Sequence, residues 1–532
     1  MSALVLTSHL WDPTALPGAH WRSAPRGATP EGPLPTTVDE ALTWAQAQHG
    51  QFAAVIPVEG ATLLVTDFGR TIPLLCTRVG GRWVVADHPR PLLEMMPEAR
   101  LDADGAFQFR HAGFVLGQRT LIEGMWQVPA SSVVELRDGE ETPRAHMAHM
   151  FRYGPDRTDD EQSFAAGFLA ALDAAVSRTV ELAGQRQIAV PLSGGIDSRL
   201  LMALLCRAEA KRVLAFTYGV PGSTEAEVSR TVAQEIGAEW VFVPTDAQKV
   251  RRAWIDEGGA FLEDGWAGAC LPHYQDWFAL RELTGNGTLE PGAVVLPGHT
   301  VVGNLHDEQV VTQGRVLGRR ELAEVLADHH FCLQGRPRDV RANKVVVEEM
   351  RAFLDEINWE PTSTHVQSWI EWFNIRERQA KYINNSMRAY EHFGLDWALP
   401  MLDRGVVRAW ESGCYTFTDG PRHWYARFTS DLYARTTGAG GEYWAPTLGR
   451  LDSRVKGALV SVLRATRADE AARRILSTRT QLNHPMAFEA FLGTHRSSQY
   501  VKDLLGGRTL QGVFADLFLA DDWAPGTAIL PH

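Results

Sequence analysis

Cysteine is scarce in this sequence, and its spacing matches neither a metal site nor a disulfide framework. The 532 residues include only five cysteines, which are Cys76, Cys206, Cys270, Cys332 and Cys414. They are odd in number and far apart, so none has the short spacing of a zinc site. A chain of this length can form about two to four domains with large apolar cores, and we expect no disulfide scaffold.

Positive charge is also in short supply. Lysine and arginine number 52 against 64 aspartates and glutamates, which gives a formal net charge of −12. This balance argues against a broad surface for nucleic acid or for an anionic membrane, although a local basic pocket for phosphates is compatible with it. We therefore expect a small-molecule partner, with no nucleic acid and no membrane.

Two kinds of apolar segment are missing as well. The first residues, MSALVLTSHLWDP, lack the charged leader, apolar block and cleavage site of a secretory signal. An uninterrupted run of about eighteen apolar residues does not occur either. With 45% hydrophobic and 22% charged residues, the composition is that of an ordinary globular protein. We interpret the chain as soluble and cytoplasmic.

The most informative stretch that is present covers residues 185–205, QRQIAVPLSGGIDSRLLMALL. Residues 187–192 are a short apolar run suited to a buried parallel strand, and residues 193–198 are a polar break with two glycines. Residues 199–205 then have the spacing and the strong helix formers of an amphipathic helix. The pattern predicts a strand, a glycine loop and a helix.

This arrangement suits the capture of an anion. Gly194 and Gly195 let backbone N–H groups approach a ligand closely, and the helix directs its positive end there. Ser193 and Ser198 add hydroxyl donors, whereas the carboxylate of Asp197 would repel phosphates unless it held a divalent cation. No lysine follows the glycines, which excludes the GxxxxGKS phosphate loop. The stretch predicts a nucleotide–Mg²⁺ site with Asp197 as the metal ligand.

The hexapeptide Ser193-Gly194-Gly195-Ile196-Asp197-Ser198 resembles the pyrophosphate-binding loop of the ATP pyrophosphatase family. The resemblance implies that the loop binds the phosphates of ATP, and that pyrophosphate leaves as an acyl-adenylate forms. Leu192 precedes the loop at the position where asparagine synthetases, which the chain also resembles, pack an apolar residue on the adenine base.

The first 155 residues indicate a sheet-rich domain. Residues 36–49 are predicted as a helix, and from Gly50 short strand-like runs such as QFAAVIPV, TLLVTDFGR and RWVVAD alternate with turns. The segments at 50–52, 67–70 and 122–129 resemble, in order, the amino-terminal glutaminase domain of class B asparagine synthetases. The resemblance implies an Ntn-hydrolase-like sandwich over residues 1–155.

The nucleophile of that glutaminase is not retained. In the family it is a cysteine exposed as residue 2, whereas this chain has Ser2. Serine serves as an amino-terminal nucleophile in other amidohydrolases, but its hydroxyl is far harder to ionise than a thiol. The family's arginine and asparagine segments for glutamine are also not found. We therefore expect a degenerate glutaminase domain.

Residues 156–532 are expected to form the second domain. A charged, turn-rich linker precedes a helix at 163–183, after which apolar strands at 187–192, 213–219 and 240–243 alternate with helices. Such alternation predicts an α/β domain with a parallel sheet, in which ligands bind beyond the carboxyl ends of the strands. The resemblance to asparagine synthetase, which has an adenine nucleotide α-hydrolase-like fold, adds Thr217, Tyr218 and Gly219 as residues of the adenine pocket.

Further helix residues follow this pair of strands. Glu225 and Arg230 match a helix of the family, with a solvated helix face as the alternative. Glu371 and Glu377 are candidate carboxylates for the substrate, with the same alternative. The segment 400–403, PMLD, resembles one that closes the family's substrate side.

A second glycine turn lies at residues 294–303, VVLPGHTVVG. Gly298 matches the glycine turn that follows a strand in the family, and the family's second metal-binding aspartate falls on Val302. Valine cannot bind a metal, so Mg²⁺ must rely on Asp197, water and the phosphates, or on Asp307 or Glu308 nearby.

His299, beside that glycine, lies where the family's residues approach the acyl-adenylate and the incoming amine. It can accept the amine's proton as a general base. The alternative is a histidine that is merely hydrogen-bonded at the end of a strand. The family also has a lysine that reaches the phosphates later in the chain. The candidate cations for that role are Arg450, Arg454 and Lys456. We expect residues after about 455 to be a helical extension.

These features predict an ATP-dependent ligase that forms amide bonds, with ATP and Mg²⁺ as cofactors. A small-molecule or peptide carboxylate would be adenylated and then attacked by ammonia or a substrate amine. Because Ser2 replaces the cysteine, the nearest analogues would be β-lactam synthetases and lasso-peptide cyclases; a homodimer stays open. One alternative is an ATP-binding, catalytically degenerate homologue that acts as a partner or scaffold. Another is a tRNA-modifying thiolase, which the net charge and the lack of paired cysteines disfavour.

Overall fold

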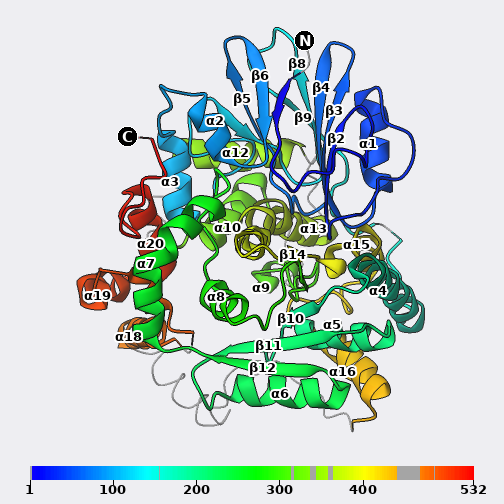
Figure 1. Ribbon diagram of the computed structural model, residues 1–532, viewed down its shortest axis with the longest axis vertical. Helices are drawn as coiled ribbons and strands as arrows, with labels where there is room; N and C mark the ends of the chain where they lie inside the picture. The colour runs from blue at the N-terminus through cyan, green and yellow to red at the C-terminus, as the bar shows by residue number, and fades with distance from the viewer. Residues whose placement is uncertain are drawn as a thin grey trace.

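The computed structural model describes residues 3–154, 156–312, 317–335, 343–356, 363–439, 468–484 and 486–531. Within these ranges the strands form two sheets in the amino-terminal part and one in the remainder (Figure 1). The first sheet has the order β1 (Leu4–Leu6), β6 (Arg82–Ala86), β5 (Leu75–Val79) and β7 (Met125–Gln127). The second, antiparallel throughout, has the order β2 (His20–Ala24), β3 (Gln51–Val58), β4 (Ala61–Thr66), β8 (Ser132–Arg137) and β9 (Arg144–Met147).

The alternation of side chains along β3 explains how these two sheets are layered. Ala53 and Val55 lie in an apolar core that also contains residues of the first sheet. Phe52, Ala54 and Ile56, which point the other way, pack instead with Ala41 and Trp44 of α1 (Val38–Ala47). The predicted helix at 36–49 is therefore confirmed. The amino-terminal part has two sheets that share a core, while its assignment as an Ntn-hydrolase-like sandwich and the boundary near residue 155 remain predictions.

The third sheet is parallel, as the alternating pattern predicts. Its order is β12 (Glu239–Pro244), β11 (Val213–Gly219), β10 (Ile188–Pro191), β13 (Val294–Val295) and β14 (Asp396–Trp397). The chain runs outward from β10 through β11 to β12 and then returns to the other side of β10 to form β13. The sheet therefore has a topological switch point at β10, which is where ligands bind in parallel α/β sheets.

Five helices between residues 161 and 285 accompany this sheet. They are α4 (Glu161–Ala183), α5 (Ile196–Arg207), α6 (Thr224–Ile236), α7 (Ala247–Gly265) and α8 (Trp277–Gly285). Among the described helices, α4 is the one long and apolar enough to cross a membrane by length and composition. Its Phe164, Phe168, Leu172 and Val176 are buried, and it packs against α5 and α15 as a core helix of a globular domain does.

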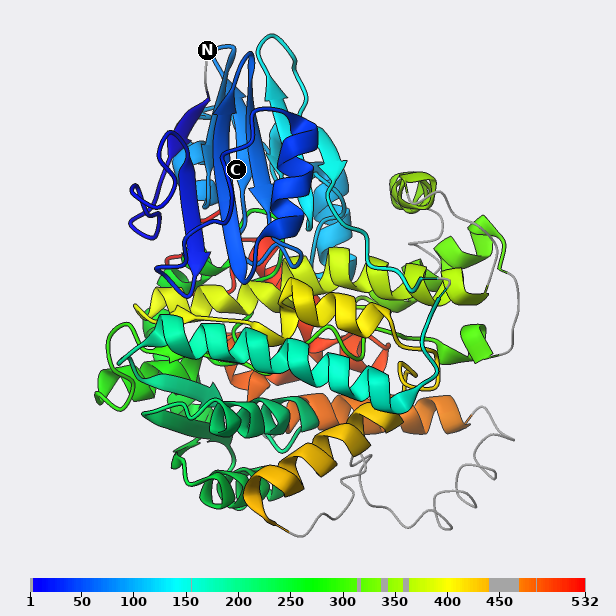
Figure 2. The same ribbon diagram turned by 90° about the vertical axis from the view of Figure 1, so that its right-hand side faces the viewer.

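The remaining secondary-structure elements of the described chain are helices. A run from residue 363 to residue 392 lies between the amino-terminal sheets and the parallel sheet in both views (Figures 1 and 2). That run consists of α13 (Ser363–Phe373), the π-helix η1 (Asn374–Ile383), η2 (Asn384–Ser386) and α14 (Met387–His392). The other elements are α2 (Pro89–Glu94), α3 (Ala103–Ala112), α9 (Glu308–Thr312), α10 (Arg319–His330), α12 (Lys344–Glu356), η3 (Pro400–Leu402), α15 (Arg404–Glu411), α16 (His423–Thr437), α18 (Ala468–Leu482), η4 (Phe488–Leu492), α19 (Ser497–Leu505) and α20 (Leu510–Leu519). Helix α20 packs against α3.

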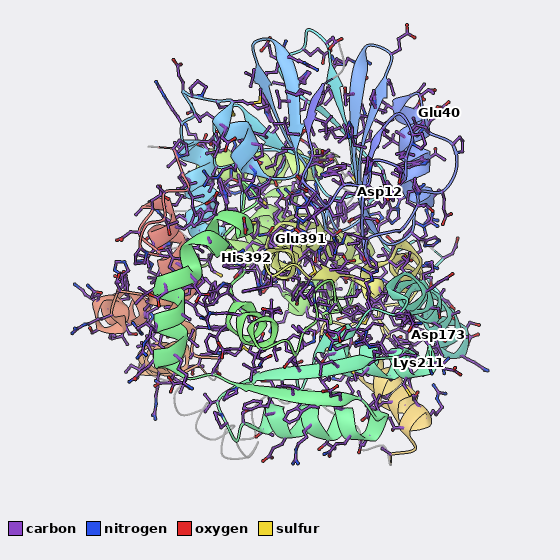
Figure 3. The ribbon with its side chains drawn as sticks, in the orientation of Figure 1. Asp12, Glu40, Asp173, Lys211, Glu391 and His392 are labelled. Carbon is purple, nitrogen blue, oxygen red and sulfur yellow. The ribbon has the colours of Figure 1, made fainter. Side chains whose placement is uncertain are left out.

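Buried charges fasten the amino-terminal sheets to this helical layer. Arg22 of β2 donates to Asp87 at 2.5 Å and also pairs with Glu391 of α14, labelled in Figure 3. Lys381 of η1 is fully buried and donates to the carbonyl oxygens of Val115 at 2.7 Å and Gly117 at 2.9 Å. Since an uncompensated buried charge is costly, these pairs fix how the two layers meet.

The PMLD segment makes a similar connection. Asp403 accepts a hydrogen bond from the backbone N–H of Gly50 at 2.9 Å and pairs with Arg178 of α4 at 3.0 Å. Burial raises the pKa of Asp403, but bonds from His49 and Gly50 and the charge of Arg178 outweigh it and lower the pKa to about 2. The segment therefore holds α4, the GQF strand start and α15 together.

Candidate functional site

The strand, glycine loop and helix predicted for residues 187–205 are confirmed, as β10 leads into the loop and then α5. Gly195 is the N-cap of α5, and the structure shows no side-chain hydrogen bond at that cap. The first turn of the helix can therefore offer backbone N–H groups to a ligand. The loop is held by its own serines, because the hydroxyl oxygens of Ser193 and Ser198 lie 3.2 Å apart.

Gly298 packs directly on this loop. It follows β13, the strand next to β10. A Cβ at Gly298 would lie 2.9 Å from the backbone nitrogen of Ser198 and 3.2 Å from Cβ of Asp197. The approach leaves no room for a side chain, so the two glycine-containing turns meet at the carboxyl end of the sheet.

A cavity of about 320 Å³ opens at this junction. Among the predicted site residues, its lining includes Leu192, Ser193, Asp197, Ser198, Thr217, Tyr218, Gly298 and His299. The predicted residues Gly194, Gly195, Ile196 and Gly219 do not line it. The predicted residues in this lining come from three separate segments of the sequence, and they converge on one space beyond the carboxyl ends of β10 and β11.

Several polar groups in the cavity lining already have hydrogen-bond partners within the protein. The hydroxyl of Thr217 donates to the carbonyl oxygen of Leu192 at 2.7 Å, which links the ends of β11 and β10. Tyr218 donates its hydroxyl to Asp276, which also accepts from the hydroxyl of Tyr390 at 2.7 Å. Asp276 was not predicted, since it follows a loop with no recognisable motif and reaches the cavity only through the fold.

His299 lies in the cavity lining in its neutral form. Burial and the neighbouring His273 lower its pKa to about 4, and Asp276 opposes them only in part. Its Nδ1 is buried and has no hydrogen-bond partner among the described residues. A neutral imidazole with a free ring nitrogen can accept a proton, but a pKa near 4 is below the value that is best for a base at neutral pH.

Asp197 both lines the cavity and forms an ion pair with Arg422, the residue that precedes α16. The guanidinium of Arg422 also lies 4.8 Å from the centre of the Tyr425 ring. Burial lowers the pKa of Arg422, but the charge of Asp197 outweighs burial and holds that pKa above its ordinary value. The predicted cations Arg450, Arg454 and Lys456 lie outside the described residues. Arg422 was not predicted, because no motif marks it.

The donors available for a divalent cation can be listed from the cavity lining. Asp197 and Glu225 both contribute carboxylates, and Glu225 approaches the loop, where its Oε1 accepts from the N–H of Gly194 at 3.4 Å. Val302 is buried in the apolar core, 5% exposed, and offers no ligand. Mg²⁺ commonly uses one or two carboxylates together with substrate phosphates, so the donor set fits this ion.

Two other acidic residues suggested for the metal have different partners. Asp307 bonds Nδ1 of His306 at 2.8 Å, and Glu308 accepts from the hydroxyl of Tyr415 at 2.6 Å. Neither residue lines the cavity. Ser2, the residue at the position of the glutaminase nucleophile, lies outside the described residues.

The alternative interpretation of Glu371 and Glu377 as a solvated helix face is wrong. Their exposed fractions are 2% and 3%. Glu371 accepts from the hydroxyl of Tyr153 at 3.0 Å, and Glu377 pairs with Lys381 at 2.5 Å. Neither lines the cavity. Glu377 also accepts from the backbone N–H of Gly117 at 3.1 Å, so both glutamates join the helical run at 363–392 to segments before residue 160. Their charge spacing on one helix could not reveal that burial.

A known protein family matches one part of the chain. Residues 167–275 match the model of the asparagine synthase family. This segment contains most of α4, then β10, the glycine loop, β11, β12 and the helices between them. The match supports the asparagine synthetase superfamily, whose members are ATP-using ligases, but it does not separate its subtypes. No curated protein matches the chain.

Two solved structures share more distant likeness. The NH3-dependent NAD synthetase from Campylobacter jejuni, in complex with nitrate, is 18% identical with a TM-score of 0.19, over 31% of this chain and 64% of its own. The U34-tRNA thiolase NcsA from Methanococcus maripaludis, with its [4Fe-4S] cluster, is 12% identical with a TM-score of 0.23. The match covers 64% of this chain and 80% of the thiolase. This chain therefore spans less than two thirds of the NAD synthetase, and these TM-scores are too low to carry a structural argument.

Proposed function

We propose that the protein is an ATP-dependent ligase that forms an amide bond by activating a carboxylate as an acyl-adenylate. The supporting observation is the cavity in which the SGGIDS loop, Gly298 and the ends of β10 and β11 converge. The carboxylate would attack the α-phosphorus of ATP and release pyrophosphate. Ammonia or an amine on the substrate would then attack the acyl carbon and release AMP.

The parts of the cavity divide between the base and the phosphates. Leu192, Thr217 and Tyr218 form the side suited to the adenine. Ser193, Ser198 and the amino terminus of α5 form the side suited to the phosphates. Asp197 and Glu225 would hold Mg²⁺, which neutralises phosphate charge when bound.

Arg422 supplies the cation that this site needs for the leaving pyrophosphate. It is paired with Asp197 and is therefore already placed at the loop. Negative charge grows on the pyrophosphate as the bond to the α-phosphorus breaks, and a preplaced guanidinium stabilises that charge. Arg422 would thus perform the task of the lysine that the family carries.

His299 is the proposed acceptor of the amine's proton. Its unpartnered Nδ1 and its neutral form suit this role. The negative phosphates of a bound nucleotide would raise its pKa from about 4 toward neutral, because a nearby negative charge favours the protonated imidazole. The substrate is proposed to be a small-molecule or peptide acid in the cytoplasm, without glutaminase activity in this chain.

Calorimetry with ATP, with and without Mg²⁺, tests this function first. We expect Mg²⁺-dependent binding that falls at least about tenfold in Asp197→Asn, which corresponds to about 1.4 kcal/mol. Asp173→Asn is the matched control, because Asp173 lies on α4 in an exposed pair with Arg207 (Figure 3). Binding that needs no Mg²⁺, or no binding, would contradict the proposal.

Turnover separates a ligase from a degenerate homologue. With panels of acids and amines, a ligase forms AMP and pyrophosphate, and Arg422→Met should lower that rate by about 10²–10³-fold. The alternative function, an ATP-binding partner or scaffold, is favoured by the apolar Val302 at the place of the family's second aspartate. It predicts Mg²⁺-ATP binding without any acid-dependent release of pyrophosphate.

A further inference from the structure

Three histidines gather at the carboxyl end of α10, outside the nucleotide cavity. His329 and His330 are the last two residues of that helix, and His306 comes from the loop that also carries Gly298 and His299. Each residue offers a ring nitrogen, and these nitrogens lie within 4.8 Å of one another. The rings of His306 and His329 are stacked with their centres 3.6 Å apart.

The hydrogen bonds of this cluster leave nitrogen lone pairs without partners. Nδ1 of His306 lies 2.8 Å from the Asp307 carboxylate, which can only accept, so Nδ1 carries the proton and Nε2 carries the lone pair. Nε2 of His306 is buried and has no partner among the described residues. His330 is 3% exposed, and both of its ring nitrogens are likewise buried without a hydrogen-bond partner among the described residues. Buried polar atoms without partners need a ligand or another explanation.

Asp307 has an unusual backbone conformation and lies near two of the histidines. Its φ is +50°, in the left-handed region that a non-glycine residue rarely adopts. Its carboxylate lies 3.9 Å from Nδ1 of His329 as well. A carboxylate behind a histidine that sets its tautomer and orientation is the usual outer-shell partner of a metal-binding imidazole.

Two features beside the histidines attract a cation. The carboxyl end of α10 and Asp307 both attract positive charge, whereas Arg378 opposes it.

We propose that His306, His329 and His330 bind a borderline divalent transition metal, with Zn²⁺ as the best-matched ion and Asp307 as the outer-shell partner of His306. Three imidazole nitrogens suit zinc and exclude Mg²⁺ and Ca²⁺, which require oxygen ligands. A fourth position would be left for water or a substrate group. The site is distinct from the carboxylates proposed for Mg²⁺ and does not depend on the ligase function.

The geometry requires one of the three rings to reorient. Zinc–nitrogen bonds of about 2.0–2.1 Å in a tetrahedral site place ligand nitrogens roughly 3.3 Å apart. The ring nitrogens of the cluster lie within 4.8 Å of one another, which is wider than this spacing. The side chain of His329 is 39% exposed, so its ring has room to rotate out of the stack and bring its nitrogen closer to the other two. Binding would connect the end of α10 to the loop that carries Gly298 and His299, which places the metal where it can order that side of the nucleotide cavity.

The test uses the full-length, tag-free protein titrated with Zn²⁺ in competition with a chromophoric chelator, and with Co²⁺ as a spectroscopic substitute. We expect one equivalent of metal and the strong visible absorption of tetrahedral cobalt. His306→Gln and His330→Gln should each weaken Zn²⁺ binding at least 100-fold, and Asp307→Asn by about 10- to 100-fold.

The controls separate this site from other ligands. His392→Gln removes a histidine of α14 that pairs with Asp264 of α7 and is not part of the cluster, so it should leave binding unchanged. Cys332→Ser should also leave Zn²⁺ binding unchanged, because no thiolate belongs to the proposed site. A thiolate ligand would reveal itself by a sulfur-to-cobalt charge-transfer band. Thermal unfolding of the metal-free variants shows whether they are folded. Absence of Zn²⁺ binding, or equal affinity in folded His306→Gln, His330→Gln and wild type, would overturn the proposal.

Discussion

The contact between Gly298 and the glycine loop gives the sharpest test of the site's construction. In Gly298→Ala the new Cβ would lie 2.9 Å from the backbone nitrogen of Ser198, 3.2 Å from Cβ of Asp197 and 3.3 Å from its carbonyl carbon. Two of these atoms belong to the backbone, so no flexible side chain can move away. The loop itself must shift by several tenths of an ångström.

Overpacking of this kind costs about 1–3 kcal/mol. If the binding geometry of the loop must be restored at that cost, ATP affinity falls roughly 5- to 150-fold. The assay is calorimetric titration of Gly298→Ala with Mg²⁺-ATP, after circular dichroism has shown that the variant is folded. Gly167→Ala is the control, because a Cβ there has no atom within 4 Å and lies in α4. It should bind ATP as wild type does and gain about 0.5–1 kcal/mol in stability. A folded Gly298→Ala with wild-type affinity would refute the reasoning.

Two further predictions concern buried charges between the layers. Lys381→Met removes the nearer of the two cations beside the buried Glu377 carboxylate and leaves only Arg376, at 3.6 Å. Denaturant unfolding should show a loss of up to about 3–5 kcal/mol. The double variant Glu377→Gln/Lys381→Met should recover part of that loss, and an equal or larger loss would contradict the role of the pair. Burial raises the pKa of Glu371 from 4.5 to about 8, despite hydrogen bonds from Gln367 and Tyr153 that lower it. The folded state therefore keeps a proton that the unfolded state releases, so its contribution is complete below pH 4.5 and is lost as pH rises through about 8. Between those limits the free energy of unfolding of Glu371→Gln should increase relative to that of the wild type as pH rises. If the two free energies change in parallel with pH, the raised pKa of Glu371 is refuted.

The parts of the site that the sequence predicts are those with local patterns. The apolar run, the two glycines and the amphipathic spacing at 187–205 depend on neighbours a few residues away, and they specify β10, the loop and α5. The parallel sheet follows from the same alternation repeated. Gly298 and His299 were found through the family resemblance, and both line the cavity.

The parts that the sequence does not reveal depend on long-range packing. Arg422 reaches Asp197 across more than two hundred residues of sequence, and Asp276 collects the hydroxyls of Tyr218 and Tyr390 from two other elements. Neither is preceded by a motif. The burial of Glu371 and Glu377 arises from the layer that covers their helix, which a charge pattern within one helix cannot show.

The contact between α20 and α3 has a consequence for how the chain is made. Phe109 of α3 lies against Phe518, with ring centres 5.5 Å apart, and Arg110 pairs with Asp516 at 2.8 Å. A ribosome adds about 5–20 residues per second, so one face of α3 stays bare for roughly 20–80 s before its cover emerges. During that interval the nascent amino-terminal part exposes an aromatic surface that chaperones can recognise. Synthesis must be nearly complete before the first segment is fully enclosed.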